Sequence, residues 1–152
     1  MGVCRSSRPG RRGFVLIVTC IALTILLALA VLGIDIGRML MIRSELQVFT
    51  DAAALNAALE FDGTEPSKTR ARTAATSLAT GPNAMKWDMG TQPITQITTS
   101  FNTDSTGLPS VRVNASVPAP VIFIRVFQPA ESTLVAAASV ARKSAEGARL
   151  VQ

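Results

Sequence analysis

Residues 14–34 read FVLIVTCIALTILLALAVLGI, a run of 21 residues without a charged side chain. A helix rises about 1.5 Å per residue, so this run would span about 31 Å, which matches the roughly 30 Å hydrocarbon core of a bilayer. We therefore predict one transmembrane helix over residues 14–34. The apolar region of a signal peptide is shorter, about 7–15 residues, and ends at a small-residue cleavage site. Here the helix-forming sequence continues without proline as far as Pro66, which favours a retained anchor.

The segment before this run, residues 1–13, is a basic leader without an acid. Its four arginines are Arg5, Arg8, Arg11 and Arg12. On the other side of the run the nearest basic residues, Arg38 and Arg43, are offset by Asp35 and Glu45. Lys and Arg resist translocation across a membrane, so we expect the leader to stay in the cytoplasm and the rest of the chain to lie outside it.

Composition excludes several classes of function. The net charge is +5, but without the leader arginines the chain has 11 bases against 10 acids, which leaves no basic surface for nucleic acid. The chain has no His or Tyr, and its cysteines are Cys4 in the leader and Cys20 inside the apolar run. Most nucleophile-base pairs and zinc sites cannot be built from these residues. We predict no catalytic, cofactor-binding or metal-binding residues.

Residues 35–61 are predicted to continue the helix above the membrane. This segment is rich in Ala, Leu and Met and carries an apolar stripe at spacings of three and four: Ile42, Leu46, Phe49, Ala53 and Ala57. The stripe requires a covering element. Asp62, Gly63 and Pro66 end the helix, and a small domain follows over residues 62–141.

Within this domain we expect a second helix over residues 65–80, then a loop over residues 81–93 with Trp87 against the domain. Alternation of apolar and polar residues predicts a strand most clearly at 111–117. Further strands are expected at 94–101, 120–127 and 134–141, although the alanines of the last segment also favour helix. Short turns favour antiparallel pairing, so the predicted fold class is α+β with an antiparallel sheet. Residues 142–152 are expected to form a loose polar tail.

The outer end of the apolar run carries a pattern typical of helix-helix packing. Gly33 and Gly37 form G-x-x-x-G, which lets another helix backbone approach closely and suggests self-association into a homo-oligomer; the same spacing also arises by chance in such helices. Asp35 lies between the two glycines. It either faces water at the interface or forms a polar contact between subunits, and Arg38 is close enough along the helix to reach it.

Four motifs follow one another in fixed order: RRGFVLI (residues 11–17), GIDIGR (33–38), RSELQ (43–47) and DAAALNAA (51–58). Together they resemble the N-terminal module of the TadE/TadG-like proteins of tight-adherence (Tad, or Flp) pilus systems. Residues 111–117, 118–123 and 133–141 resemble the strands that follow the anchor in TadG-like proteins.

The resemblance implies an accessory protein of a type IV-like pilus, anchored once in the bacterial inner membrane with its domain in the periplasm or outside the cell. It implies a pilin-like fold in which a long N-terminal helix packs on a small sheet. The implied partners are the membrane and other pilus-assembly or pilin subunits. The leading hypothesis is a non-enzymatic assembly component that acts through helix-helix and domain contacts. Larger TadG-like proteins carry an adhesion-type domain, for which 152 residues leave no room.

Two alternatives remain open. Gly13 and Phe14 resemble a prepilin peptidase site, so the chain is alternatively a processed minor pilin or pseudopilin in the filament or at its tip. Val18 stands where the mature pilin would carry Glu, which argues against the filament shaft. A membrane-tethered binding or sensor domain is the second alternative, with a pocket lined by aromatic residues: Trp87, Phe101, Phe123 and Phe127.

Overall fold

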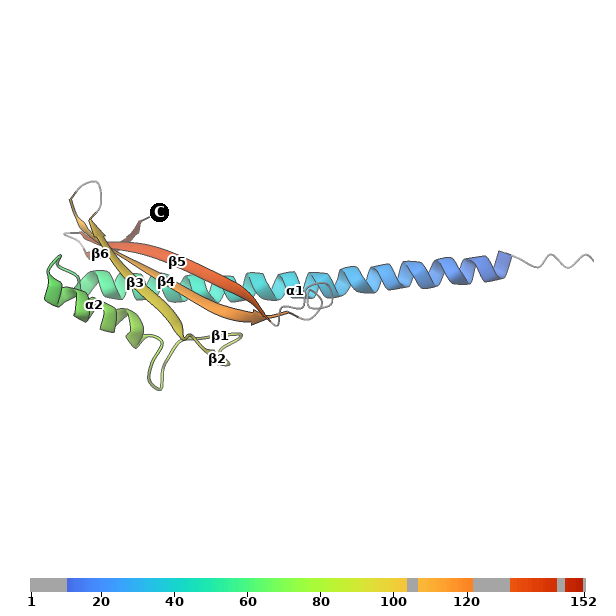
Figure 1. The fold of residues 1–152 in the computed structure, drawn as a ribbon, viewed down its shortest axis with the longest axis horizontal. Coiled ribbons are helices and arrows are strands. Elements are labelled where there is room, and N and C mark those ends of the chain that lie inside the picture. Colours follow the sequence, from blue (N-terminus) through green and yellow to red (C-terminus); the bar gives the residue numbers. More distant parts are fainter. Residues whose placement is uncertain (1–10, 104–106, 122–131, 145–146, 152) are drawn as a thin grey trace, which may run out of the picture.

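The computed structural model describes residues 11–103, 107–121, 132–144 and 147–151 (Figure 1). One helix, α1 (Arg11–Glu60), runs the length of the molecule. Its N-terminal half extends alone, and its C-terminal half lies against a small domain with antiparallel sheets. The predicted α+β fold class is confirmed, and so is the single long helix expected over residues 14–61.

The end of α1 is fixed by local chemistry. Gly63 adopts φ 92°, a left-handed conformation that glycine reaches without the steric cost of a Cβ, and the chain reverses there. Lys143 donates a hydrogen bond from Nζ to the carbonyl oxygen of Leu59 over 3.0 Å, so a cation from the sheet caps the negative end of the helix.

The second helix, α2 (Glu65–Ser77), begins after Thr64 and has proline in its first turn, where a missing N–H costs nothing. It ends three residues before the predicted boundary. Small side chains of α2, Ala71 and Ala75, are buried in one cluster with Ala54 and Ala58 of α1. Small residues at such a contact allow the two helices to pack closely.

The main sheet is an antiparallel meander of four strands in sequence order: β3 (Gln96–Thr103), β4 (Pro109–Pro120), β5 (Ser132–Ser144) and β6 (Gly147–Val151). A separate two-stranded hairpin is formed by β1 (Lys86–Trp87) and β2 (Gln92–Pro93). The core lies between α1 and the sheet. Alternate residues of β4 are buried against the helical stripe that contains Leu46 and Phe49: Val111, Val113, Ala115, Val117 and Ala119.

Residues 134–141 are strand, as expected, because their pairing with β4 outweighs the helical preference of alanine. Two details differ from the sequence predictions. The expected loose tail is wrong over 142–144, which complete β5, and over 147–151, which form β6. The expected loop over 81–93 contains the β1–β2 hairpin. Of the segment expected at 120–127, Pro120 ends β4, and residues 122–127 lie outside the described residues.

Candidate functional site

The apolar part of α1 has no covering element among the described residues. Every residue from 14 to 27 is exposed, and Phe14 keeps 69% of its surface accessible. Within the described part of the chain, α1 is the one helix that is both long enough and apolar enough to cross a membrane. An apolar surface of this length is stable in lipid rather than in water, which is consistent with a membrane anchor.

Directly above this segment, the β1–β2 hairpin attaches to α1 through an ion pair. Nη2 of Arg38 lies 3.0 and 2.8 Å from the two carboxylate oxygens of Asp88. Trp87 precedes this aspartate, is buried in the core, and donates its indole N–H to the carbonyl oxygen of Pro93 over 3.0 Å. The buried indole ring therefore holds the hairpin against the core, and the partly exposed ion pair holds it against α1.

A second contact holds the same hairpin one step further along the helix. The backbone N–H of Met89 donates to Oε1 of Glu45 over 3.0 Å. Arg38 and Glu45 are seven residues apart, about two helical turns, so both reach the same side of α1. Asp88 and Met89 have φ 55° and 56°, a left-handed conformation that costs free energy for residues with a Cβ. We call the Arg38–Asp88 ion pair and the Met89–Glu45 hydrogen bond together the hairpin clamp.

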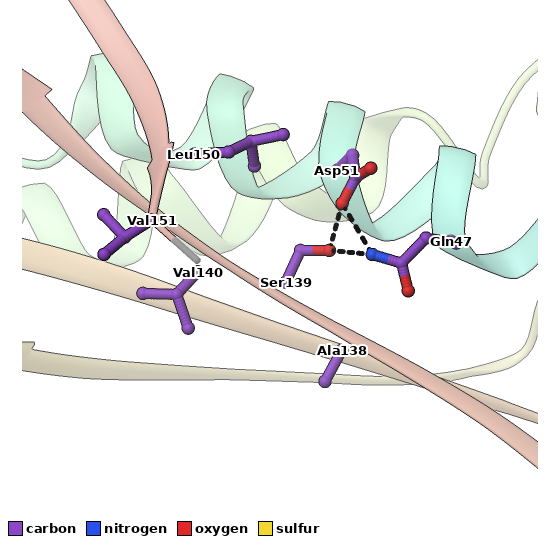
Figure 2. Close-up of a pocket in the computed structure, with 7 residues that line it drawn as sticks. All are labelled: Gln47, Asp51, Ala138, Ser139, Val140, Leu150 and Val151. Atoms are coloured by element: carbon purple, nitrogen blue, oxygen red, sulfur yellow. Dashed lines mark hydrogen bonds between the residues drawn. The ribbon is translucent and has the colours of Figure 1, made fainter.

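A polar junction joins α1 to the middle of β5. Figure 2 shows Gln47 and Asp51 of α1 meeting Ser139 of β5. Gln47 donates from Nε2 to Oδ1 of Asp51 over 2.9 Å and to Oγ of Ser139 over 3.0 Å, and Ser139 donates to Asp51. The hydroxyl of Thr50, which is buried, lies 3.0 Å from that of Ser139.

This junction forms one wall of a cavity of about 260 Å³ between α1, β5 and β6, whose apolar wall includes Leu150 and Val151 (Figure 2). The polar groups of Gln47, Asp51 and Ser139 bond to one another, so the junction connects helix to sheet. Gln47 and Asp51 belong to the RSELQ and DAAALNAA motifs. The alanines of the second motif are buried or half-buried, and thus the two motifs together form the surface on which the domain sits.

The residues suggested for packing against another helix at the membrane exit differ in their surroundings within the chain. Gly33 and Gly37 are exposed, and no described atom outside the local helix lies within 4 Å of a Cβ placed on either of them. Asp35, for which both a water-facing position and a contact between subunits were left open, is 3% exposed within the chain. Nη2 of Arg38 lies 2.8 Å from a carboxylate oxygen of Asp88 in the domain.

The remaining candidates fall at the N-terminus. Arg5 and Arg8 lie outside the described residues, and Arg11 and Arg12 begin α1. Gly13 and Phe14 lie in the first turns of α1 and are exposed. Their role in topology or processing stays a prediction.

Among the described residues, no group of three or more His, Cys, Asp or Glu side chains is placed to hold a metal ion.

Of the aromatic residues suggested for a ligand pocket, Trp87 lies in the core, and Phe101 packs against the core and also lines a cavity of about 210 Å³ beside Phe61. Phe101 contacts Phe61, with ring centroids 4.8 Å apart, and the guanidinium of Arg72 lies 5.2 Å from its centroid. Trp87 packs under the hairpin. Phe123 and Phe127 lie outside the described residues. Sequence reasoning did not identify the pairing of Glu45 with the hairpin, since a backbone donor leaves no signal in the sequence.

These features define a class: a small α+β domain fixed to a single long helix whose free half is suited to a membrane. A family model, putative Flp pilus-assembly TadE/G-like, matches residues 13–60, so this segment is similar to TadE/G-like proteins. No curated protein and no solved structure matches the chain. The family match supports a role in pilus assembly and suggests a structural rather than a catalytic role. Together with the apolar helix, it is consistent with a membrane-anchored envelope protein.

Proposed function

We propose that this chain is a non-enzymatic assembly component of a Tad-like pilus. In this proposal α1 crosses the bacterial inner membrane once, the arginine-rich leader stays in the cytoplasm, and the α+β domain stands on the other side. The observation that carries the proposal is the TadE/G-like match over residues 13–60, which coincides almost completely with α1.

The contacts between α1 and the domain support this role. The hairpin clamp, the apolar core and the polar junction attach the domain along the helix from Arg38 to Ala58. The matched segment therefore contains both the membrane span and the platform for the domain. A domain attached along that length follows its anchor as one body. In this proposal the attachment holds the contact surface for pilus subunits at a fixed height above the membrane.

The proposal is tested in the source bacterium by deleting the gene and counting surface pili by electron microscopy. We expect few or no pili in the deletion strain and recovery with the full-length chain. A reporter fused after Gln152 should be active on the outer side of the inner membrane. Normal piliation without the protein, or recovery of the chain in the soluble fraction without detergent, would contradict the proposal.

A second candidate is a minor pilin or pseudopilin cleaved between Gly13 and Phe14. It is favoured by the exposure of both residues at the start of α1, where a membrane peptidase can reach the peptide bond. N-terminal sequencing of the mature protein separates the two candidates. A mature chain that begins at Phe14 has lost the arginine leader and is a processed subunit, whereas an intact leader identifies the retained anchor.

A further inference from the structure

One side of α1 carries no covering element of the described domain above the membrane. It runs along the helix at spacings of three and four and comprises Gly37, Leu40, Met41, Ser44 and Val48, which we call the open face. Leu40, Met41 and Val48 are 62%, 44% and 58% exposed. Large apolar side chains gathered on one helix side in this way mark a surface that binds another protein.

The open face continues directly into the lipid-facing surface of the same helix. Gly33 lies one turn below Gly37 on that side, and neither glycine has a described atom outside the local helix within 4 Å of its Cβ position. Two missing side chains one turn apart let a second helix backbone approach closely. A partner helix that covers both glycines runs beside α1 from the apolar segment into the open face.

The charge pattern of α1 fits a second copy of the same helix as this partner. Between Gly33 and Val48 the charged residues of α1 are Asp35, Arg38, Arg43 and Glu45, and at 100° per residue all four fall outside the open face. In a two-fold pair of parallel helices, each residue near the axis meets its own copy, so a charged residue there would repel itself. An uncharged face avoids that repulsion.

We propose that a second copy of this chain packs on the open face, with the two α1 helices parallel through the membrane and for about 20 Å above it. This pairing rests on the proposed function, which supplies the single crossing of α1 and its direction through the membrane. Because every copy crosses the bilayer in the same direction and to the same depth, Gly33 and Gly37 of one copy lie at the height of the same residues in the other. The glycines of the two copies then face one another.

A groove beside the open face extends the surface that the second copy covers. It has a volume of about 280 Å³, lies between α1 and β5, and shares Leu40 with the open face; its other lining residues are Met39, Arg43, Thr133, Leu134, Val135 and Ala136. Leu134 is 64% exposed. A helix on the open face also shields this leucine, so the contact reaches from the helix to the first half of β5.

Cysteine crosslinking in native membranes tests the proposal. In a full-length background with Cys4→Ser and Cys20→Ser, single cysteines replace Gly37, Ser44 or Ile36, and the other pilus components are not expressed. Ile36 is the matched control, because it is exposed at the height of Gly37 but lies 100° around the helix. We expect oxidative dimers at positions 37 and 44, with a severalfold lower yield at position 36.

Equal yields at all three positions indicate random collision and overturn the proposal. Absence of dimers at 37 and 44 also overturns it. Each of these results leaves the proposed function intact if the deletion strain still regains pili with the chain. Conversely, dimers in a strain that makes normal pili without this chain support the pairing and contradict the proposed function.

A substitution at Gly37 provides an independent test. Gly37→Leu adds a side chain where the subunit has open space among its described residues, so the subunit itself should fold normally, which Trp87 fluorescence checks. The added side chain would separate two paired helices. When Gly37→Leu is combined with Ser44→Cys, we expect a severalfold lower dimer yield than with Ser44→Cys alone, and Ile36→Leu is the control that leaves the yield unchanged. An unchanged yield in Gly37→Leu overturns the proposal.

Discussion

One guanidinium nitrogen of Arg38 donates to both carboxylate oxygens of Asp88, although 50 residues separate the two in the sequence. The side chains of this pair are 34% and 17% exposed, so water screens the interaction less than at an open surface. The pair joins the point where α1 leaves the apolar segment to the tip of the β1–β2 hairpin. It ties the lower edge of the domain to the anchor.

We expect Asp88→Ala to lower the free energy of unfolding by about 1–2 kcal/mol, because a charge-assisted contact is lost and a partly shielded arginine is left behind. Urea unfolding of the detergent-solubilised chain, followed by the fluorescence of Trp87, measures this. Protease cleavage within residues 86–93 should increase as the hairpin detaches. Lys86→Ala, an exposed change on the same hairpin, is the control.

Charge reversal distinguishes loss of the pair from general damage to the hairpin. The double substitution Arg38→Asp with Asp88→Arg should recover part of the stability that either single substitution removes. If Asp88→Ala changes neither the unfolding midpoint nor the cleavage pattern, the ion pair does not hold the hairpin.

The buried alanines of the DAAALNAA motif lead to a second prediction. Ala57 is fully buried in the core between α1 and its neighbours, so Ala57→Leu forces additional atoms into a packed contact. We expect a loss of about 1–3 kcal/mol in unfolding free energy. Leu59→Ala, at an exposed position of the same helix, should change it by less than about 0.5 kcal/mol. Similar effects of the two substitutions would show that the motif is not a packing surface.

The polar junction gives a third prediction. Ser139→Ala removes the hydroxyl that Asp51 and Gln47 share, and it should cost about 1–2 kcal/mol of unfolding free energy. Because these residues form one network, Asp51→Asn and Ser139→Ala should be non-additive in a double-mutant cycle. Ser100→Ala, on β3 away from the junction, is the control. Strict additivity would mean that the contacts do not act together.

The long helix could be predicted because its evidence is local. The absence of proline and the spacing of Ile42, Leu46 and Phe49 are properties of neighbouring residues, and the structure confirms both the helix and its buried side. The partner of Arg38 could not be predicted in this way. A local rule favours Asp35, three residues away, whereas the observed partner is reached only once the hairpin has folded back against the helix.

A strand was expected at 134–141, but helix stayed open as the alternative because the local sequence does not decide between them. Residues 136–138 are three consecutive alanines, whose own preference is helical, and the pairing with β4 that overrides it depends on residues about 20 positions away. The strand β6 was missed because it has five residues and an exposed, partly polar surface. It is stabilised by pairing with residues 140–144, most of which were themselves expected to belong to a tail.

A last prediction concerns acid stability at the turn between α1 and α2. Hydrogen bonds from the side chain and backbone of Thr64 and from the side chain of Ser67, with a smaller contribution from Arg70, hold the pKa of Asp62 well below its usual range. A carboxyl group whose pKa is lower in the folded state stabilises that state above its unfolded pKa, about 4, and loses this effect as the pH falls further. Asp62→Asn should therefore reduce stability at pH 6 and flatten its decline below about pH 4. Unfolding midpoints across this pH range measure the effect, with the exposed Glu65→Gln as the control. An acid decline that is as steep in Asp62→Asn as in the unchanged protein would place the sensitive group elsewhere.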